Sequence, residues 1–95
     1  MDLKNTIEIM QSDDYKERFK AEYLQTKIRY EKLKKFNTQI EAAEQTIFCP
    51  PNRNGTTMAM PHHDCPAELL RRQQNIMGEY LHILELRAEI EGIVL

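Results

Sequence analysis

Glycine is scarce in this sequence, and long apolar runs are missing from it. Only 3 of the 95 residues are Gly, whereas 29% are Asp, Glu, Lys or Arg, a composition that favours helices over an all-β fold. No apolar run approaches the roughly 20 residues that a membrane-spanning helix needs. The first five residues lack the basic and then apolar pattern of a signal peptide. We therefore expect one small cytoplasmic domain, spanning residues 1–95, that does not enter a membrane.

Common enzyme signatures are missing as well. The sequence contains no P-loop, G-x-G-x-x-G, H-E-x-x-H or G-x-S-x-G motif. We accordingly expect a protein that binds rather than one that catalyses a reaction.

Cysteine occurs only twice, at Cys49 and Cys65. In a cytoplasmic protein, thiols or metal ligands are favoured over a disulfide. Together with His62 and His63 these residues offer the thiolate and imidazole groups of a tetrahedral zinc site. Their spacing is not that of paired-Cys zinc sites, however, and the alternative is that the His62-His63-Asp64 run simply solvates a loop and caps a helix.

The strongest pattern lies in residues 65–92, which are predicted to form one amphipathic helix. Pro66 suits its start and Gly92 its C-terminal end. A row that steps by four and three is occupied by Leu69, Gln73, Ile76, Tyr80, Ile83, Arg87, Ile90 and Val94, and a second row beside it by Leu70, Met77, Leu84 and Ala88. Two adjoining rows are wider than a two-stranded coiled-coil seam needs, so this helix should contact more than one neighbour.

A second long helix is predicted over residues 14–47. Asp14 and Glu17 have the spacing of a capping box at its start. The same four-three repeat follows, at Phe19, Tyr23, Thr26, Tyr30, Leu33, Asn37, Ile40, Glu44 and Ile47. Residues 1–11 should form a short helix, or an arm that packs on a neighbouring subunit.

The connector, residues 48–64, contains prolines and an Asn54-Gly55 pair that exclude helix and favour turns. The predicted fold is therefore all-α: a coiled-coil-like antiparallel hairpin of two long helices with a Pro/Gly-containing connector. Such a hairpin cannot cover both rows of the last helix, so we expect a homo-oligomer.

Positive charge is concentrated between residues 16 and 35, where eight Lys or Arg face three Glu, a balance of +5. From His62 onward three Arg face six acidic residues, a balance of −3. Two interpretations are open: the acidic helix pairs with the basic one, or the basic helix binds an anionic ligand.

A stripe of cations and aromatic rings makes the second interpretation specific. It consists of Lys16, Lys20, Tyr23, Lys27, Tyr30 and Lys34, which share one helical face. Ammonium groups bind phosphates and phenol rings stack on bases; alternatively, both tyrosines are core residues bordered by lysine stems. Arg71 and Arg72 would either add guanidinium groups to an anion site or remain solvated.

Two blocks, residues 7–36 and 64–93, together resemble a family of small phage and prophage proteins of Firmicutes described as related to a crAss-like phage protein. The resemblance rests on Ser12-Asp13-Asp14-Tyr15-Lys16-Glu17-Arg18-Phe19, Cys65-Pro66-Ala67-Glu68-Leu69-Leu70 and Met77-Gly78-Glu79-Tyr80-Leu81. It implies a phage origin, and hence the cytoplasm of an infected or lysogenic bacterium, but no particular chemistry.

By analogy, small helical phage proteins often counter host defence, and the anti-CBASS and anti-Thoeris sponges are helical oligomers that sequester cyclic nucleotide signals. The expected function is thus a counter-defence protein that sequesters a cyclic nucleotide or related phosphorylated messenger at a subunit interface. The alternatives are an anti-CRISPR-like, protein-binding inhibitor of a host defence enzyme, and a structural or regulatory coiled coil.

Overall fold

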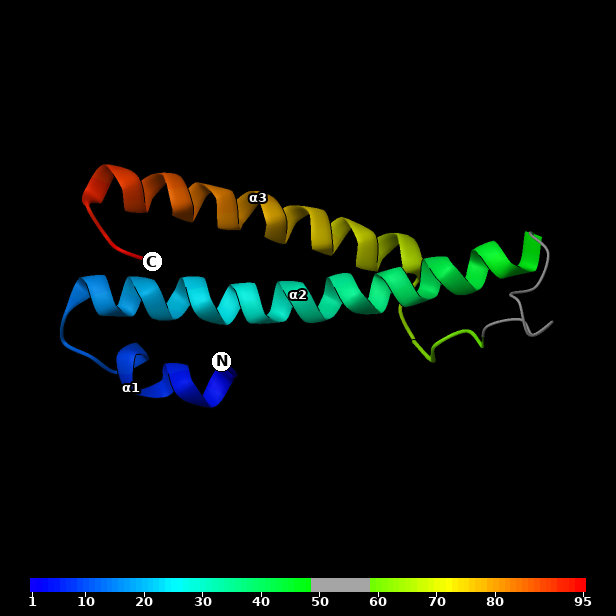
Figure 1. The fold of residues 1–95 in the computed structure, drawn as a ribbon, viewed down its shortest axis with the longest axis horizontal. Helices are drawn as coiled ribbons and strands as arrows, with labels where there is room; N and C mark the ends of the chain where they lie inside the picture. The colour runs from blue at the N-terminus through cyan, green and yellow to red at the C-terminus, as the bar shows by residue number, and fades with distance from the viewer. Residues whose placement is uncertain (49–58) are drawn as a thin grey trace.

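The computed structural model describes residues 1–48 and 59–95. It contains a 3-10 helix, η1 (Leu3–Thr6), a short helix, α1 (Ile7–Met10), and two long helices, α2 (Tyr15–Phe48) and α3 (Ala67–Glu91). Figure 1 shows α2 and α3 running antiparallel side by side, with α1 on the opposite side of α2. The predicted all-α hairpin is confirmed. None of the described helices is long and apolar enough to cross a membrane.

The N-terminal residues form a short helix that packs on α2 of the same chain. Thr6 is fully buried there, and its Oγ1 accepts a hydrogen bond of 2.9 Å from Nε2 of Gln25. Ala21, one turn before Gln25 on α2, is also buried. Of the two expectations for residues 1–11, the short helix is the one observed.

The starts of the long helices differ in detail from the sequence prediction. Asp14 caps α2, because its Oδ1 accepts a 3.0 Å bond from the backbone N–H of Lys16. The backbone N–H of Asp14 donates to Oγ of Ser12 at 3.1 Å. Ser12 therefore accepts the hydrogen bond that the capping box predicted for the Glu17 side chain. Pro66 precedes α3 as its N-cap residue, and α3 has no side-chain cap.

The end of α3 depends on Gly92, which adopts a left-handed conformation with φ of 71°. This turn lets the backbone N–H of Ile93 donate to the carbonyl of Ala88 at 2.8 Å. Ile93 then folds back and is only 7% exposed. A glycine stop followed by a buried apolar residue is the arrangement expected of a Schellman-type helix end.

We expect Gly92→Ala to lower the free energy of unfolding by about 1 kcal/mol, because a left-handed backbone strains any residue that carries a Cβ. A Cβ at this position would have no atom within 4 Å, so the cost is one of backbone conformation rather than of a clash. Urea unfolding measures it. Gly92→Asn is the matched control, since Asn tolerates the left-handed region, and an equal loss in both variants would contradict this explanation.

The core lies between the N-terminal half of α2 and the C-terminal half of α3. Its buried residues are Phe19, Tyr23, Leu81, Leu84, Ala88 and Ile93, with Leu24 and Tyr30 packed against them. The second predicted row of the last helix, which includes Leu84 and Ala88, therefore faces α2. The first row remains exposed at Leu69, Ile76, Tyr80, Ile83, Ile90 and Val94.

Tyrosine–glutamate hydrogen bonds join the two long helices at successive levels. Tyr15 donates to Oε1 of Glu91 at 3.0 Å, and Tyr23 donates to Oε2 of Glu85 at 2.6 Å. Tyr80 of α3 donates in the opposite direction, to Oε1 of Glu22. At the far end of the hairpin, Nδ2 of Asn37 donates to the backbone carbonyl of Leu70 at 3.1 Å and to the Gln74 side chain at 2.9 Å.

Candidate functional site

A groove runs along one side of the α2–α3 junction, and three of the predicted ligand-binding residues line it. Its cavity of about 180 Å³ is lined by Tyr23, Lys27, Tyr30 and Glu31 from α2 and by Gly78, Leu81, His82 and Glu85 from α3. We call it the junction groove. Sequence reasoning identified Tyr23, Lys27 and Tyr30 but missed Glu31 and the contribution of α3.

Tyr23 lines the groove but is largely buried beneath it. Its side chain is only 7% exposed, and its hydroxyl is engaged with Glu85. This hydrogen bond, together with burial and the negative charge of Glu85, raises the pKa of Tyr23 to about 12. Nζ of Lys27 lies 5.8 Å from the centre of the Tyr23 ring. The burial leaves little of this ring free to stack on a ligand.

Tyr30 is the more accessible of the two rings. It is half-buried and lies directly over Gly78, where an added Cβ would come within 3.2 Å of Cε1 of Tyr30. Such a contact is tighter than most, so a residue with a Cβ would require the ring to shift by a few tenths of an ångström. A glycine inside a helix lowers helix stability by about 1 kcal/mol relative to alanine. Gly78 in the middle of a predicted helix was therefore a sign, visible in the sequence, that another group packs closely there.

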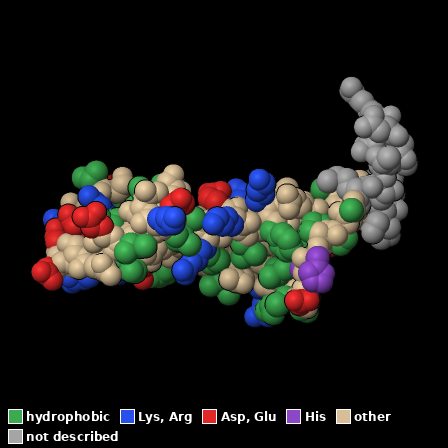
Figure 2. Space-filling model, turned by 90° about the horizontal axis from the view of Figure 1, so that it is seen from below, with side chains coloured by type: hydrophobic (Ala, Val, Ile, Leu, Met, Phe, Trp, Pro, Cys, Tyr) green, Lys and Arg blue, Asp and Glu red, His purple; other side chains and the backbone are tan. Residues whose placement is uncertain are grey.

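The lysines of the stripe remain available for a ligand. Lys16, Lys27 and Lys34 are exposed and Lys20 is half-buried. The ion pairs among the described residues involve Arg or His, at Arg71–Glu44, Arg87–Glu91, His62–Asp64 and His82–Glu85, and none involves a lysine. The alternative interpretation, in which α3 neutralises the basic charge of α2 by pairing, therefore does not account for the lysines. Figure 2 shows Lys and Arg side chains along the middle of the molecule on its α1 side as well.

A second cavity adjoins the groove, and its lining has glutamates but not the lysine that the groove has. Its volume is about 530 Å³, and it shares Tyr23 and Glu85 with the groove. The rest of its lining is Ala88, Glu89 and the C-terminal residues 92–95. Its ionisable side chains are two glutamates and one tyrosine, so it repels anions. A bound anion would therefore place its charge at the Lys27 end of the groove and not at this end.

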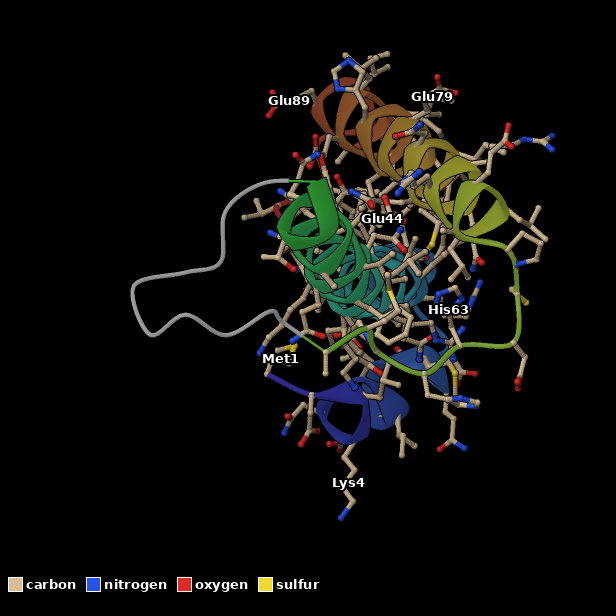
Figure 3. The ribbon with its side chains drawn as sticks, turned by 90° about the vertical axis from the view of Figure 1, so that its right-hand side faces the viewer. Met1, Lys4, Glu44, His63, Glu79 and Glu89 are labelled. Atoms are coloured by element: carbon tan, nitrogen blue, oxygen red, sulfur yellow. The ribbon has the colours of Figure 1, made fainter. Side chains whose placement is uncertain are left out.

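Arg71 and Arg72 do not join the lysine stripe. Nη2 of Arg71 donates to both carboxylate oxygens of Glu44, at 3.1 and 2.9 Å, and Figure 3 shows Glu44 on the side of α2 that faces α3. Glu44 is ten residues beyond Lys34, about 15 Å along the helix. Arg72 instead lines an apolar depression with Leu69 and Ile76.

The predicted metal ligands do not assemble a site in the part of the chain that the structure describes. Nε2 of His62 lies 3.4 Å from Oδ1 of Asp64. Nδ1 of His63 lies 2.6 Å from the carbonyl oxygen of Cys65, and its ring packs edge-on against Phe36. Among the described residues, no three His, Cys, Asp or Glu are grouped so as to hold a metal ion. Cys49 lies outside the described residues.

A comparison with protein families identifies this architecture. The model of the Sequestin family matches residues 13–50 and 55–90, which include nearly all of both long helices and every residue of the junction groove. The chain belongs to the Sequestin family. No curated protein and no solved structure gave a match. Membership of the Sequestin family suggests a sequestering, sponge-like phage protein, and it leaves the ligand to be inferred from the groove.

Proposed function

We propose that this protein sequesters a cyclic nucleotide or a related phosphorylated immune messenger, which it binds without converting. The observation that carries the proposal is Lys27, which lines the junction groove of a Sequestin-family chain beside Tyr30 and takes part in none of the ion pairs among the described residues. A phage protein that holds such a messenger lowers its free concentration and so keeps the defence effector inactive.

The groove suggests an orientation for the ligand. Tyr30 offers a half-exposed ring, and Lys27 and Lys34 lie one turn before and after it on the same face of α2. Stacking of a base on an aromatic side chain contributes about 1–3 kcal/mol, while the ammonium groups attract phosphates. A base against Tyr30 with its phosphates toward the lysines satisfies both preferences.

The α3 side of the groove supplies polar specificity. Oε2 of Glu85 accepts from Tyr23, and Oε1 of Glu85 lies 3.9 Å from Nδ1 of the exposed His82. Glu85 is about half-exposed, so its carboxylate can accept a further hydrogen bond from a ribose hydroxyl or an exocyclic amine. Its charge also disfavours phosphates at that end, which reinforces the orientation set by Lys27.

The volume of the junction groove limits how much of a ligand one chain can enclose. Pockets for small molecules usually measure about 300–1,000 Å³, whereas the junction groove measures about 180 Å³. The groove therefore holds one ring of a nucleotide, and the remainder lies over the lysine stripe. Binding stoichiometry tests this arrangement: one ligand per chain indicates a site within each chain, and one per two chains indicates the shared subunit interface expected from the sequence.

We expect Lys27→Ala to weaken nucleotide binding about tenfold or more, because a hydrogen bond to a charged group contributes about 1.5–3 kcal/mol. The melting temperature should not change, since Lys27 is exposed and unpaired within the described chain. Calorimetry against cyclic di- and trinucleotides and cyclic ADP-ribose isomers measures the effect. Lys4→Ala, at an exposed lysine on η1 that does not line the groove, is the matched control.

Two further measurements separate sequestration from its alternatives. The affinity should fall as salt is raised from low to physiological concentration, because exposed charges are screened over about 8–10 Å. Ligand released by denaturing the complex should be chemically intact, whereas an altered ligand would indicate an enzyme. If no member of the panel produces heat or a thermal shift, the proposal fails and a protein target becomes the better hypothesis.

A further inference from the structure

A further cavity lies on the flank of α2 next to the junction groove, and we call it the N-terminal pocket. Its volume is about 420 Å³. One of its walls comes from the start of the N-terminal segment, where Figure 3 shows Met1 on the side of α2 away from α3. The complete lining is Met1 and, from α2, Leu24, Lys27, Ile28, Glu31 and Lys32.

The lining of the N-terminal pocket combines an apolar surface with cations at its edges. Leu24 and Ile28 are one turn apart on the same face of α2, and both are half-buried. By helical periodicity, Lys27 lies to one side of this pair and Lys32 to the other. Both lysines are exposed, and neither takes part in an ion pair among the described residues. A flat, largely apolar ring can therefore contact aliphatic side chains here while its charged substituents reach a lysine.

The N-terminal pocket and the junction groove share a boundary. Lys27 and Glu31 line both cavities, and by helical periodicity they lie between Tyr30 on one flank of α2 and Ile28 on the other. The two cavities are thus about a quarter of a turn apart around the helix. At a helix radius of about 5–6 Å this corresponds to roughly 8 Å. One molecule that passes over Lys27 can therefore occupy both cavities.

We propose that the N-terminal pocket is a second subsite of the nucleotide site, and that the ligand carries two bases joined through phosphate. This inference rests on the proposed function. One base lies against Tyr30 in the junction groove, the second lies on Leu24 and Ile28, and the phosphate between them lies at Lys27. The junction groove, at about 180 Å³, holds only one ring, whereas the N-terminal pocket has a volume usual for a small-molecule site, about 300–1,000 Å³.

The order of chemical groups around α2 favours a two-base ligand over a ligand with one base. A two-base nucleotide has its phosphates between two rings, which is the order of Tyr30, Lys27 and Ile28. A mononucleotide leaves the N-terminal pocket unused. A cyclic ADP-ribose isomer has one base, so it would bring ribose hydroxyls to the aliphatic side chains, where a polar group without a hydrogen-bond partner is disfavoured. Glu31, one turn beyond Lys27, repels phosphates and so confines them to the Lys27 end of the boundary.

Calorimetry with cyclic di-AMP and cyclic di-GMP, each compared with the cyclic mononucleotide of the same base, tests the second subsite. The better dinucleotide should bind about tenfold or more tightly than its mononucleotide, as expected if roughly 60 Å² of ring surface is buried at about 25 cal/mol per Å². Ile28→Asn should remove most of this difference and leave the mononucleotide affinity unchanged, because the substitution is neutral and lies outside the junction groove. Ile28→Ala, which should remove part of the difference, serves if Ile28→Asn does not fold.

Two control variants make the result specific to the second subsite. Ile76→Asn is the same change at an exposed isoleucine of α3 that lines neither cavity, and it should bind both kinds of ligand like the parent protein. Tyr30→Ala should weaken the binding of both kinds.

The outcomes that overturn the second subsite differ from those that overturn the proposed function. Dinucleotides that bind no more tightly than their mononucleotides, or whose affinity neither Ile28 variant lowers, would overturn the second subsite and leave the proposed function intact. A cyclic ADP-ribose isomer that binds more tightly than both dinucleotides would do the same. If the parent protein binds no nucleotide at all, the proposed function fails and the second subsite fails with it.

Discussion

Tyr23→Ala is expected to lower the free energy of unfolding by about 3 kcal/mol or more. Removal of a buried aromatic side chain usually costs 3–5 kcal/mol, and Tyr23 is only 7% exposed, within the core of the hairpin. The change also removes the hydrogen bond to Glu85. Urea unfolding followed by circular dichroism gives the loss.

Tyr30→Ala is the natural comparison, because this ring comes from the same helix but is only half-buried. Tyr30→Ala should lower the free energy of unfolding by less than Tyr23→Ala does. It should weaken nucleotide binding by more. Equal stability losses in the two variants would mean that Tyr30, too, is principally a core residue. A Tyr23→Ala variant that unfolds at the same urea concentration as the parent protein would contradict the placement of Tyr23.

Alkaline pH should destabilise the protein through the same residue. The bond to Glu85, with burial and the carboxylate charge, raises the pKa of Tyr23 from its ordinary value of 10.0 to about 12 in the folded chain. The folded state thus favours the protonated phenol. The protonated phenol stabilises the folded chain fully below about pH 10. This stabilisation is lost as the pH rises toward 12, and for two pKa units the free energy of unfolding falls by roughly 2–3 kcal/mol.

Tyr23→Phe isolates this effect, since phenylalanine keeps the ring and cannot titrate. Other tyrosines and the lysines also titrate in this range, but they do so in both proteins. The difference in unfolding free energy between the parent and Tyr23→Phe should therefore narrow between pH 10 and 12. A constant difference across that range would show that Tyr23 titrates alike in folded and unfolded chains.

The hairpin itself could be predicted from the sequence, because its determinants are local. The four-three spacing of apolar residues, the cap at Asp14 and the stop at Gly92 each act within a few residues of the chain. The choice between the two rows of α3 could not be predicted in the same way. Both rows are apolar, and periodicity alone does not say which of them faces α2.

The candidate site was predictable only in part for a related reason. Lys27 and Tyr30 share a face because of helix geometry, so the α2 half of the groove followed from spacing. The α3 half depends on how the two helices align across the connector, which is a tertiary property. That alignment brings Gly78 and Glu85 to the tyrosines and takes Arg71 to Glu44, which is why the expected arginine contribution does not appear at the groove.

Besides the tyrosine–glutamate hydrogen bonds, a buried asparagine contributes to this alignment. Asn37 is 5% exposed and uses both hydrogens of its amide on α3, one on the Leu70 carbonyl and one on Gln74, while its Oδ1 has no partner among the described residues. If α3 slid by one turn, Leu70 or Gly78 would replace Gln74 opposite the amide, and a buried donor without a partner costs about 1–3 kcal/mol. Asn37 thus favours the observed register over its neighbours, and seven residues away along α2 that register determines which part of α3 lies opposite Tyr30.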